Sequence, residues 1–320
     1  MGKYTSIGGQ ALIEGILMKS PEKTALCVRL PDGSIDTSYM EEKRLAQKHK
    51  IFGLPIIRGV VNFVESMLQG YKALMISADK SGFADLEDEN TKTEEKKDNN
   101  AFLNVVMIIG VVFGVLLSVA LFMYIPRLCV SGIELLLGKG INSPIIRSCI
   151  EQFIKLAVFV AYVWGVSFMK DIKRVFMYHG AEHKTIFCYE KGLELTVENV
   201  RLQKRLHPRC GTSFMILMIL ISVVFSTLVQ IIFPGVYTIR WLWVIAKLLM
   251  IPLICGVGYE VLKTCGRYDN VITRIISAPG MWLQKITTKE PEDDMIEIAI
   301  AALKACEPQV PDVERNDDNI

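Results

Sequence analysis

The sequence predicts an α-helical integral membrane protein with about four transmembrane helices and a smaller cytoplasmic α+β part. The 320-residue chain has 51% hydrophobic residues and a mean hydropathy of +0.33, which is too apolar for a typical soluble protein. Residues 101–125 and 212–234 contain no charged side chain. Each run is long enough to cross a hydrocarbon core of about 30 Å at about 1.5 Å per residue. Turn signals near the N-terminus indicate strands outside the membrane.

Two further spans are expected at residues 149–169 and 241–262, although both carry charges. Glu151 and Lys155 are four residues apart and can pair on one helix face, and Lys247 is close enough to a helix end to extend to the interface. Ionisable groups inside a membrane are costly and often functional. The alternative interpretation is therefore a transporter that uses Glu151, Lys155, Lys247 and Glu260.

Lysine and arginine counts orient the chain. Residues 170–211 hold nine, residues 126–148 hold three and residues 235–240 hold one. The positive-inside rule then places both termini and the long central loop in the cytoplasm. The first span begins near residue 101, too late for a secretory signal peptide. The eight scattered cysteines do not indicate disulfides in that reducing compartment, and no basic, aromatic-studded face indicates nucleic acid.

Residues 1–83 are expected to form a cytoplasmic α+β region. Pro31-Asp32-Gly33 is a turn signal between two strand-like stretches, Thr24 to Leu30 and Ser34 to Tyr39, and Ile7 to Met18 is expected to be another strand. Residues 56–76 have apolar side chains at helical spacing, which predicts an amphipathic helix on the core or on the bilayer. Residues 84–100 are nearly all charged or amide-bearing and predict a flexible linker.

The membrane domain is expected to cover residues 101–263, with a cytoplasmic loop at 170–211. In that loop, residues 170–184 should extend a helix, Thr185 to Glu190 should be a strand, and Val197 to Arg205 should be a helix capped by Thr196. A cytoplasmic or interfacial helical region is expected at 264–306. It should include a helix over 291–305 that opens with Pro291 and three acidic residues. Residues 307–320 are expected to be disordered.

The central loop contains the motif with the most chemical content, His179-Gly180-Ala181-Glu182-His183. Two histidines four residues apart share one helix face, so their imidazoles can converge on one metal ion. The order His-x-x-Glu-His is that of inverted zinc peptidases, in which the carboxylate activates water at the metal. Glu182 is therefore the candidate general base, although Gly180 weakens the helix that the motif requires.

His207 and Cys210 come from the other end of the same loop, in a turn that contains Pro208. A site of His179, His183, His207 and Cys210 would fill the tetrahedral sphere of zinc and be structural, whereas three histidines and water would leave it catalytic. Glu260 is an alternative ligand, but it can equally pair with Lys263. Two other residues were considered. Glu14 is expected to form a cap or a salt bridge, with a catalytic role as the minority interpretation, and Cys188 a buried core position.

Four separated motifs, in order, resemble the YqhQ-like family of bacterial polytopic membrane proteins of unknown function, which are labelled predicted metal-dependent enzymes. They are Gly8-Gly9-Gln10-Ala11-Leu12-Ile13-Glu14-Gly15, His179 to Lys184, His207 to Ser213, and Ala278 to Gln284 followed by Thr287-Thr288 and Glu290-Pro291. The resemblance covers most of the chain and implies a bacterial plasma membrane and several spans. It places the candidate metal residues within the family's recurrent motifs, and it implies no substrate.

Three hypotheses follow. The first is a zinc-dependent hydrolase that acts on a membrane-associated peptide or lipid at the cytoplasmic face, with Glu182 as base. The second is a non-enzymatic scaffold, in which a structural zinc site stiffens the central loop for a membrane-protein partner or a homo-oligomer. The third and weakest is the transporter. All three have the lipid bilayer as a partner.

Overall fold

The computed structural model describes residues 7–40, 50–82, 99–138, 140–141, 143–268 and 270–307. Most of the predicted linker at 84–100 and nearly all of the predicted tail at 307–320 lie outside these residues. The elements in chain order are β1 (Gly8–Leu12), β2 (Gly15–Lys19), β3 (Thr24–Arg29), β4 (Ile35–Tyr39), η1 (Lys50–Gly53), α2 (Ile57–Lys80), α4 (Asn99–Val119), η2 (Ala120–Tyr124), α5 (Ile125–Leu136), α6 (Pro144–Val166), α7 (Lys170–Glu190), α8 (Val197–Arg201), α9 (Gly211–Ile232), α10 (Pro234–Thr238), α11 (Arg240–Arg267), α12 (Val271–Thr287) and α13 (Asp293–Cys306).

Four helical segments are long and apolar enough to cross a membrane, which confirms the predicted fold class. They are Ile109–Leu136, Ile145–Val166, Gly211–Ile232 and Trp241–Gly266. The first ends later than the predicted span at 101–125, because the helix continues past Pro126 and Arg127. A π-helical turn, η2, comes directly before Pro126 and carries α4 into α5. Such a turn changes the local hydrogen-bond pattern, so the missing proline N–H does not end the helix.

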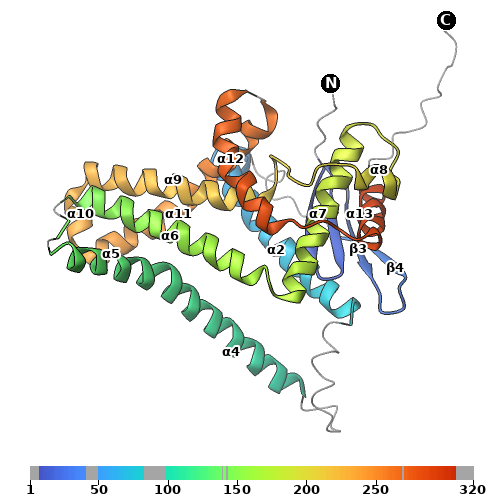
Figure 1. The fold of residues 1–320 in the computed structure, drawn as a ribbon, viewed down its shortest axis with the longest axis horizontal. Coiled ribbons are helices and arrows are strands. Elements are labelled where there is room, and N and C mark those ends of the chain that lie inside the picture. The colour runs from blue at the N-terminus through green and yellow to red at the C-terminus, as the bar shows by residue number, and fades with distance from the viewer. Residues whose placement is uncertain are drawn as a thin grey trace, which may run out of the picture.

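The spanning helices and the sheet occupy opposite ends of the molecule (Figure 1). At one end α6, α9 and α11 run side by side, and α5 and α10 lie at the far tips of that bundle. At the other end α7, α8 and α13 surround the small sheet. Helix α12 packs against α9 near the junction of the two parts.

The sheet is an antiparallel meander in the order β1-β2-β3-β4. The hairpin predicted around Pro31-Asp32-Gly33 is confirmed as β3 and β4, with Gly33 at φ +87°. The expectation of one strand from Ile7 to Met18 is wrong, because that segment folds back as β1 and β2. The reversal takes place at Glu14, whose φ of +50° is unusual for a residue with a side chain.

Alternate side chains of the strands enter two separate cores, as the period of a strand requires. Ile16 and Met18 of β2 face a core shared with α7, α8 and α13. Leu17, between them, faces a smaller core that includes Ala73 of α2. The sheet is therefore a middle layer between α7 and α13 on one face and α2 on the other.

The shared core is consistent with an even number of spans between its three segments. The sheet comes before the first span, α7 comes between the second and third spans, and α13 comes after the fourth. Four spans that alternate in direction place these three segments on the same side, where their side chains pack together.

One local prediction in the central loop is wrong: Thr185 to Glu190 is the last part of α7 and not a strand. The predicted cap is confirmed, since the Thr196 hydroxyl accepts from the Asn199 N–H, but α8 ends at Arg201.

Candidate metal centre

Helix α7 places two imidazoles of the central motif on one buried face. The ring centroids of His179 and His183 are 4.4 Å apart, and their exposed fractions are 9% and 1%. Residues four apart on a helix lie one above the other, so this proximity follows directly from the spacing in the sequence. Burial lowers the pKa of His183, which favours the neutral imidazole that binds metals.

Backbone carbonyl groups determine which nitrogen of each ring carries the hydrogen. His179 Nδ1 lies 2.8 Å from the carbonyl oxygen of Thr287, and His183 Nδ1 lies 2.5 Å from that of Arg205. A carbonyl oxygen only accepts, so both Nδ1 atoms donate and each Nε2 keeps its lone pair. Histidine ligands of metals are commonly oriented in this way.

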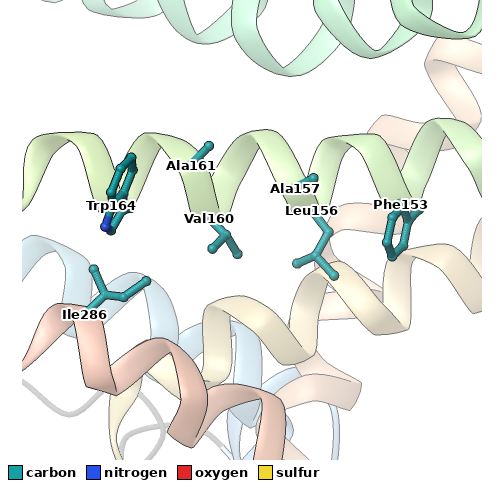
Figure 2. A pocket seen from close by; sticks show the side chains of 7 residues that line it. All are labelled: Phe153, Leu156, Ala157, Val160, Ala161, Trp164 and Ile286. Atoms are coloured by element: carbon teal, nitrogen blue, oxygen red, sulfur yellow. The ribbon is translucent and has the colours of Figure 1, made fainter.

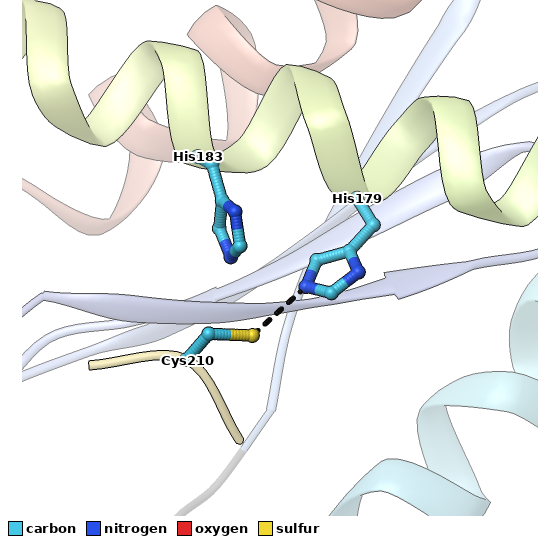
Figure 3. Close-up of side chains that lie close together, drawn as sticks. All are labelled: His179, His183 and Cys210. Atoms are coloured by element: carbon cyan, nitrogen blue, oxygen red, sulfur yellow. Dashed lines mark hydrogen bonds between the residues drawn. The ribbon is translucent and has the colours of Figure 1, made fainter. Parts of the chain in front are cut away.

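The third donor atom is the sulfur of Cys210, which approaches from the turn before α9 (Figure 3). Cys210 Sγ lies 3.1 Å from His179 Nε2 and 3.4 Å from the backbone nitrogen of Thr212. Cys210 is the N-cap residue of α9, a position where the helix dipole favours negative charge. One donor atom from each of His179, His183 and Cys210 lies within 4.8 Å of the other two. Two imidazole nitrogens and a thiol are donors that suit zinc.

Glu182 lies beside this group but is not part of it. Its carboxyl group packs against β1, where a β-carbon built at Gly9 would be 3.0 Å from Glu182 Cδ. Burial raises the pKa of Glu182 to about 7, while the nearby His179 and a hydrogen bond from the backbone of Gly9 act in the opposite direction. Gly9 belongs to the first motif of the chain, so that motif provides the space in which the candidate base is held.

The glycine of the motif permits a close backbone approach. A β-carbon at Gly180 would collide with the carbonyl oxygen of Lys289. The Lys289 N–H in turn donates to the Phe176 carbonyl at 2.8 Å, which holds the segment after α12 along α7. Because Thr287 is two residues before Lys289, this approach also places the carbonyl that orients His179.

His207 is close to the group but faces another partner. Its Nε2 is 3.9 Å from Glu190 Oε2, and its ring centroid is 5.5 Å from that of His183. Glu190 also pairs with Arg209. The buried side chain of Gln284 holds the turn, since it accepts from the His207 N–H at 2.7 Å and donates to the His207 carbonyl at 2.8 Å. His207 therefore neighbours the three donors without joining them.

The remaining candidates lie apart from the group. Both carboxylate oxygens of Glu260 accept from Arg58, at 2.6 and 2.5 Å. The ion-pair partner of Glu260 is therefore Arg58 and not Lys263, and its carboxylate is occupied by a residue of α2. Glu14 forms the expected salt bridge, because Arg174 donates to both of its oxygens. Cys188 is buried as expected, though in a helix.

The charged residues of the transporter hypothesis have local partners. Lys155 Nζ is 3.3 Å from Glu151 Oε1, as the spacing of four residues predicts. Lys247 lies over the ring of Trp243, with 5.1 Å between Nζ and the ring centroid. These contacts are at the bundle end of the molecule, whereas the His179 group is at the sheet end.

A family model described as "Protein of unknown function (DUF1385)" matches residues 54–309. The chain belongs to this family. Uncharacterized protein YqhQ of Bacillus subtilis (strain 168) is 35% identical over 295 residues, which cover 92% of this chain and 89% of the relative. No solved structure matches the chain. The resemblance drawn from the four motifs is thus confirmed, and neither description assigns an activity.

Several residues that shape the DUF1385 site were not identified from the sequence. The carbonyls of Thr287 and Arg205 act through backbone atoms, for which side-chain type gives no signal. Gln284 and Thr287 lie in the last motif, and this was the one sequence signal that could have linked them to the site. Glu190 and Arg174 appear in the sequence only as ordinary charged residues of a helix.

Proposed function

We propose that this DUF1385 protein binds one zinc ion through His179, His183 and Cys210 and is a metal-dependent hydrolase. Its substrate would be a membrane-associated lipid or peptide at the cytoplasmic face of the bacterial plasma membrane. The observation that carries the proposal is the convergence of two Nε2 atoms and one Sγ within 4.8 Å. Both imidazoles are already held in the ligating tautomer by backbone carbonyls.

The number of protein donors supports an enzyme, because three ligands would leave one position of a zinc ion open. Catalytic zinc sites have three protein ligands and leave the fourth position for water or substrate. The closed site considered from the sequence requires His207, whose Nε2 instead lies near Glu190. Hydrolysis would add water across an acyl C–O or C–N bond and release a carboxylic acid with an alcohol or an amine. The bound zinc would supply Lewis acidity.

Glu182 is the residue proposed to take the proton from the attacking water. It neighbours His183 in the sequence and is buried beside His179, so its carboxylate would act in a site with little competing solvent. The Gly9 N–H holds one side of the carboxyl group.

The spans and the charges support a cytoplasmic position for the site. Three residues separate the end of the second span at Val166 from the start of helix α7 at Lys170. The nine lysines and arginines of residues 170–211 favour the cytoplasmic side for this segment. The substrate would therefore reach the site from the inner leaflet or from the cytoplasm.

The first experiment measures metal content and ligation in protein purified without a metal-affinity tag. We expect about one zinc per chain. X-ray absorption should show a sulfur neighbour at about 2.3 Å that disappears in Cys210→Ala. Protein that is folded and free of metal after exposure to zinc would overturn the proposal.

The second experiment tests whether one position is open. In cobalt-substituted protein, acetohydroxamate should change the visible spectrum by binding the metal, whereas a closed site should give no change. Glu182→Gln should retain the metal and the cobalt spectrum. Its turnover of a phospholipid substrate should fall by about 10²- to 10⁴-fold, the usual contribution of a general base.

A structural zinc site is the second candidate, and burial favours it. All three donor side chains are less than a tenth exposed. The ion would then join α7 to the turn before α9, and the rigid cytoplasmic part would serve a membrane-protein partner or a second copy of the chain. A cobalt spectrum indifferent to acetohydroxamate, together with unfolding of Cys210→Ala, would favour this candidate over the hydrolase.

A further inference from the structure

An apolar groove of about 530 Å³ runs along the outer surface of α6. This volume is within the range of small-molecule sites, about 300–1,000 Å³. Six residues of α6 and one of α12 line it (Figure 2): Phe153, Leu156, Ala157, Val160, Ala161, Trp164 and Ile286. Apart from the indole N–H of Trp164, these side chains offer no hydrogen-bonding group. The groove therefore suits a hydrocarbon.

The length of the groove matches one leaflet of a bilayer. From Phe153 to Trp164 is eleven residues, or about 16 Å of helix. Half of a hydrocarbon core of about 30 Å is about 15 Å. Trp164 is 57% exposed and lies two residues before the end of α6, a position where indole rings commonly meet the headgroups. The groove thus extends from the membrane interface to near mid-membrane.

The interfacial end of the groove lies next to the backbone segment that orients His179. Figure 2 shows Ile286 of α12 opposite Trp164, with Phe153 at the other end. Ile286 directly precedes Thr287, whose carbonyl oxygen is 2.8 Å from His179 Nδ1. A chain that enters the groove from the leaflet would therefore have its polar end beside the segment that orients His179.

We propose that the groove holds one acyl chain of a phospholipid from the leaflet next to the sheet domain. The terminal methyl group lies by Phe153 and the ester lies by Trp164 and Ile286. This inference rests on the proposed function, since it selects a lipid ester over a peptide as the substrate class. The selection follows from the match in length, the apolar lining and the position of Ile286 directly before Thr287, whose carbonyl orients His179.

The test uses vesicles that contain phosphatidylethanolamine with a photoreactive diazirine at a defined carbon of one acyl chain. With the diazirine near the methyl end, we expect labelling at Phe153 and Leu156. With the diazirine near the ester, we expect labelling at Trp164 and Ile286. A reversed pattern, or labelling spread evenly over the lipid-facing side chains of α6, α9 and α11, would overturn the proposal.

Variants separate the groove from the ordinary lipid annulus. Val160→Trp should fill the groove and reduce labelling of α6 about tenfold, because a bulky side chain in an occupied space costs binding energy. Leu156→Trp, one turn earlier, gives a second variant if the first does not fold. Val224→Trp is the matched control, since Val224 is 57% exposed on α9 and does not line the groove. Equal labelling in Val160→Trp and Val224→Trp would refute the groove.

The two proposals can fail separately. His183→Ala should lose metal and keep the labelling pattern, because His183 does not line the groove. Site-specific labelling in a protein that never binds zinc would leave the acyl groove standing and overturn the hydrolase. Zinc binding together with labelling that does not change in Val160→Trp would overturn the acyl groove and leave the hydrolase standing.

Discussion

Helix α7 carries two polar clusters, the first half-buried and the second buried, and they are built on different principles. In the first, Arg174 donates to both carboxylate oxygens of Glu14, and the Tyr178 hydroxyl donates to Glu14 Oε2 at 3.0 Å. In the second, His179 and His183 direct their Nε2 lone pairs toward Cys210. The first cluster satisfies its own charges and hydrogen bonds. The second gathers electron-pair donors at one point.

This difference separates a structural cluster from a ligand-binding one. Glu14 stands at the reversal between β1 and β2, so its pairing with Arg174 fastens the hairpin to α7. The pairing also raises the pKa of Arg174 and keeps it charged. Among the described residues no ion pair joins His179 or His183 to a carboxylate, and their Nδ1 atoms contact backbone carbonyls. Such fixed neutral rings are suited to a cation.

The largest expected effect is loss of metal from the second cluster alone. We expect His183→Ala to lower zinc affinity at least about 100-fold, since one of three protein ligands is lost from a site whose total binding energy is about 10–16 kcal/mol. Competition with a chelator of known affinity measures this. Arg174→Gln is the matched variant from the first cluster and should leave zinc affinity unchanged. Equal losses in both variants would mean that the two clusters act as one.

A smaller effect is expected at the glycine between the two histidines. Gly180→Ala would drive a β-carbon into the Lys289 carbonyl oxygen, so the segment with Thr287 must move. We expect about a tenfold loss of zinc affinity, because displacing the partner of a ligating histidine typically costs about 10- to 100-fold. Stability should fall by about 1–2 kcal/mol, with overpacking partly offset by helix propensity.

Gly165→Ala in α6 is the control for that substitution. Its β-carbon would meet no atom within 4 Å, so the same change should be neutral or slightly stabilising. Unchanged zinc affinity in Gly180→Ala would show that the approach of Lys289 is not needed to orient His179.

The sequence was informative where a physical rule acts locally. Charge-free runs predicted the first and third spans because the bilayer sets a minimum length, and the spacing of His179 and His183 predicted a shared face because the helix period is fixed. Prediction from local patterns failed where contacts between residues distant in the sequence decide the structure. Thr185 to Glu190 has a strand-like composition but continues α7, where Ile186 and Cys188 fill the shared core. His207 turns away from the donors because Gln284, 77 residues later, holds its backbone.

The first cluster should govern stability and leave metal binding alone. Glu14→Gln removes the charge that faces Arg174 and should lower the unfolding free energy by about 1–2 kcal/mol, less than for a fully buried pair because Arg174 is 41% exposed. The apparent Tm in detergent, with zinc content measured on the same samples, tests this. Glu22→Gln, an exposed carboxylate on the neighbouring turn, should change neither quantity.

The smallest expected effect is the pH dependence of the stability difference between the native protein and Glu14→Gln. Burial alone would raise the pKa of Glu14, but the hydrogen bonds from Arg174 and Tyr178 and the charge of Arg174 outweigh it and lower the pKa below its ordinary value of 4.5. A carboxyl group with a lowered folded-state pKa stabilises the fold fully above the unfolded pKa, and this contribution is lost as pH falls through the folded pKa. The stability gap between the native protein and Glu14→Gln should therefore be constant from pH 7 to about 5.5 and shrink below pH 4.5. Unfolding curves of both proteins along this series provide the measurement. A gap that persists undiminished at pH 3.5 would mean that the hydrogen-bond geometry of Glu14, and not its charge, fastens the hairpin to α7.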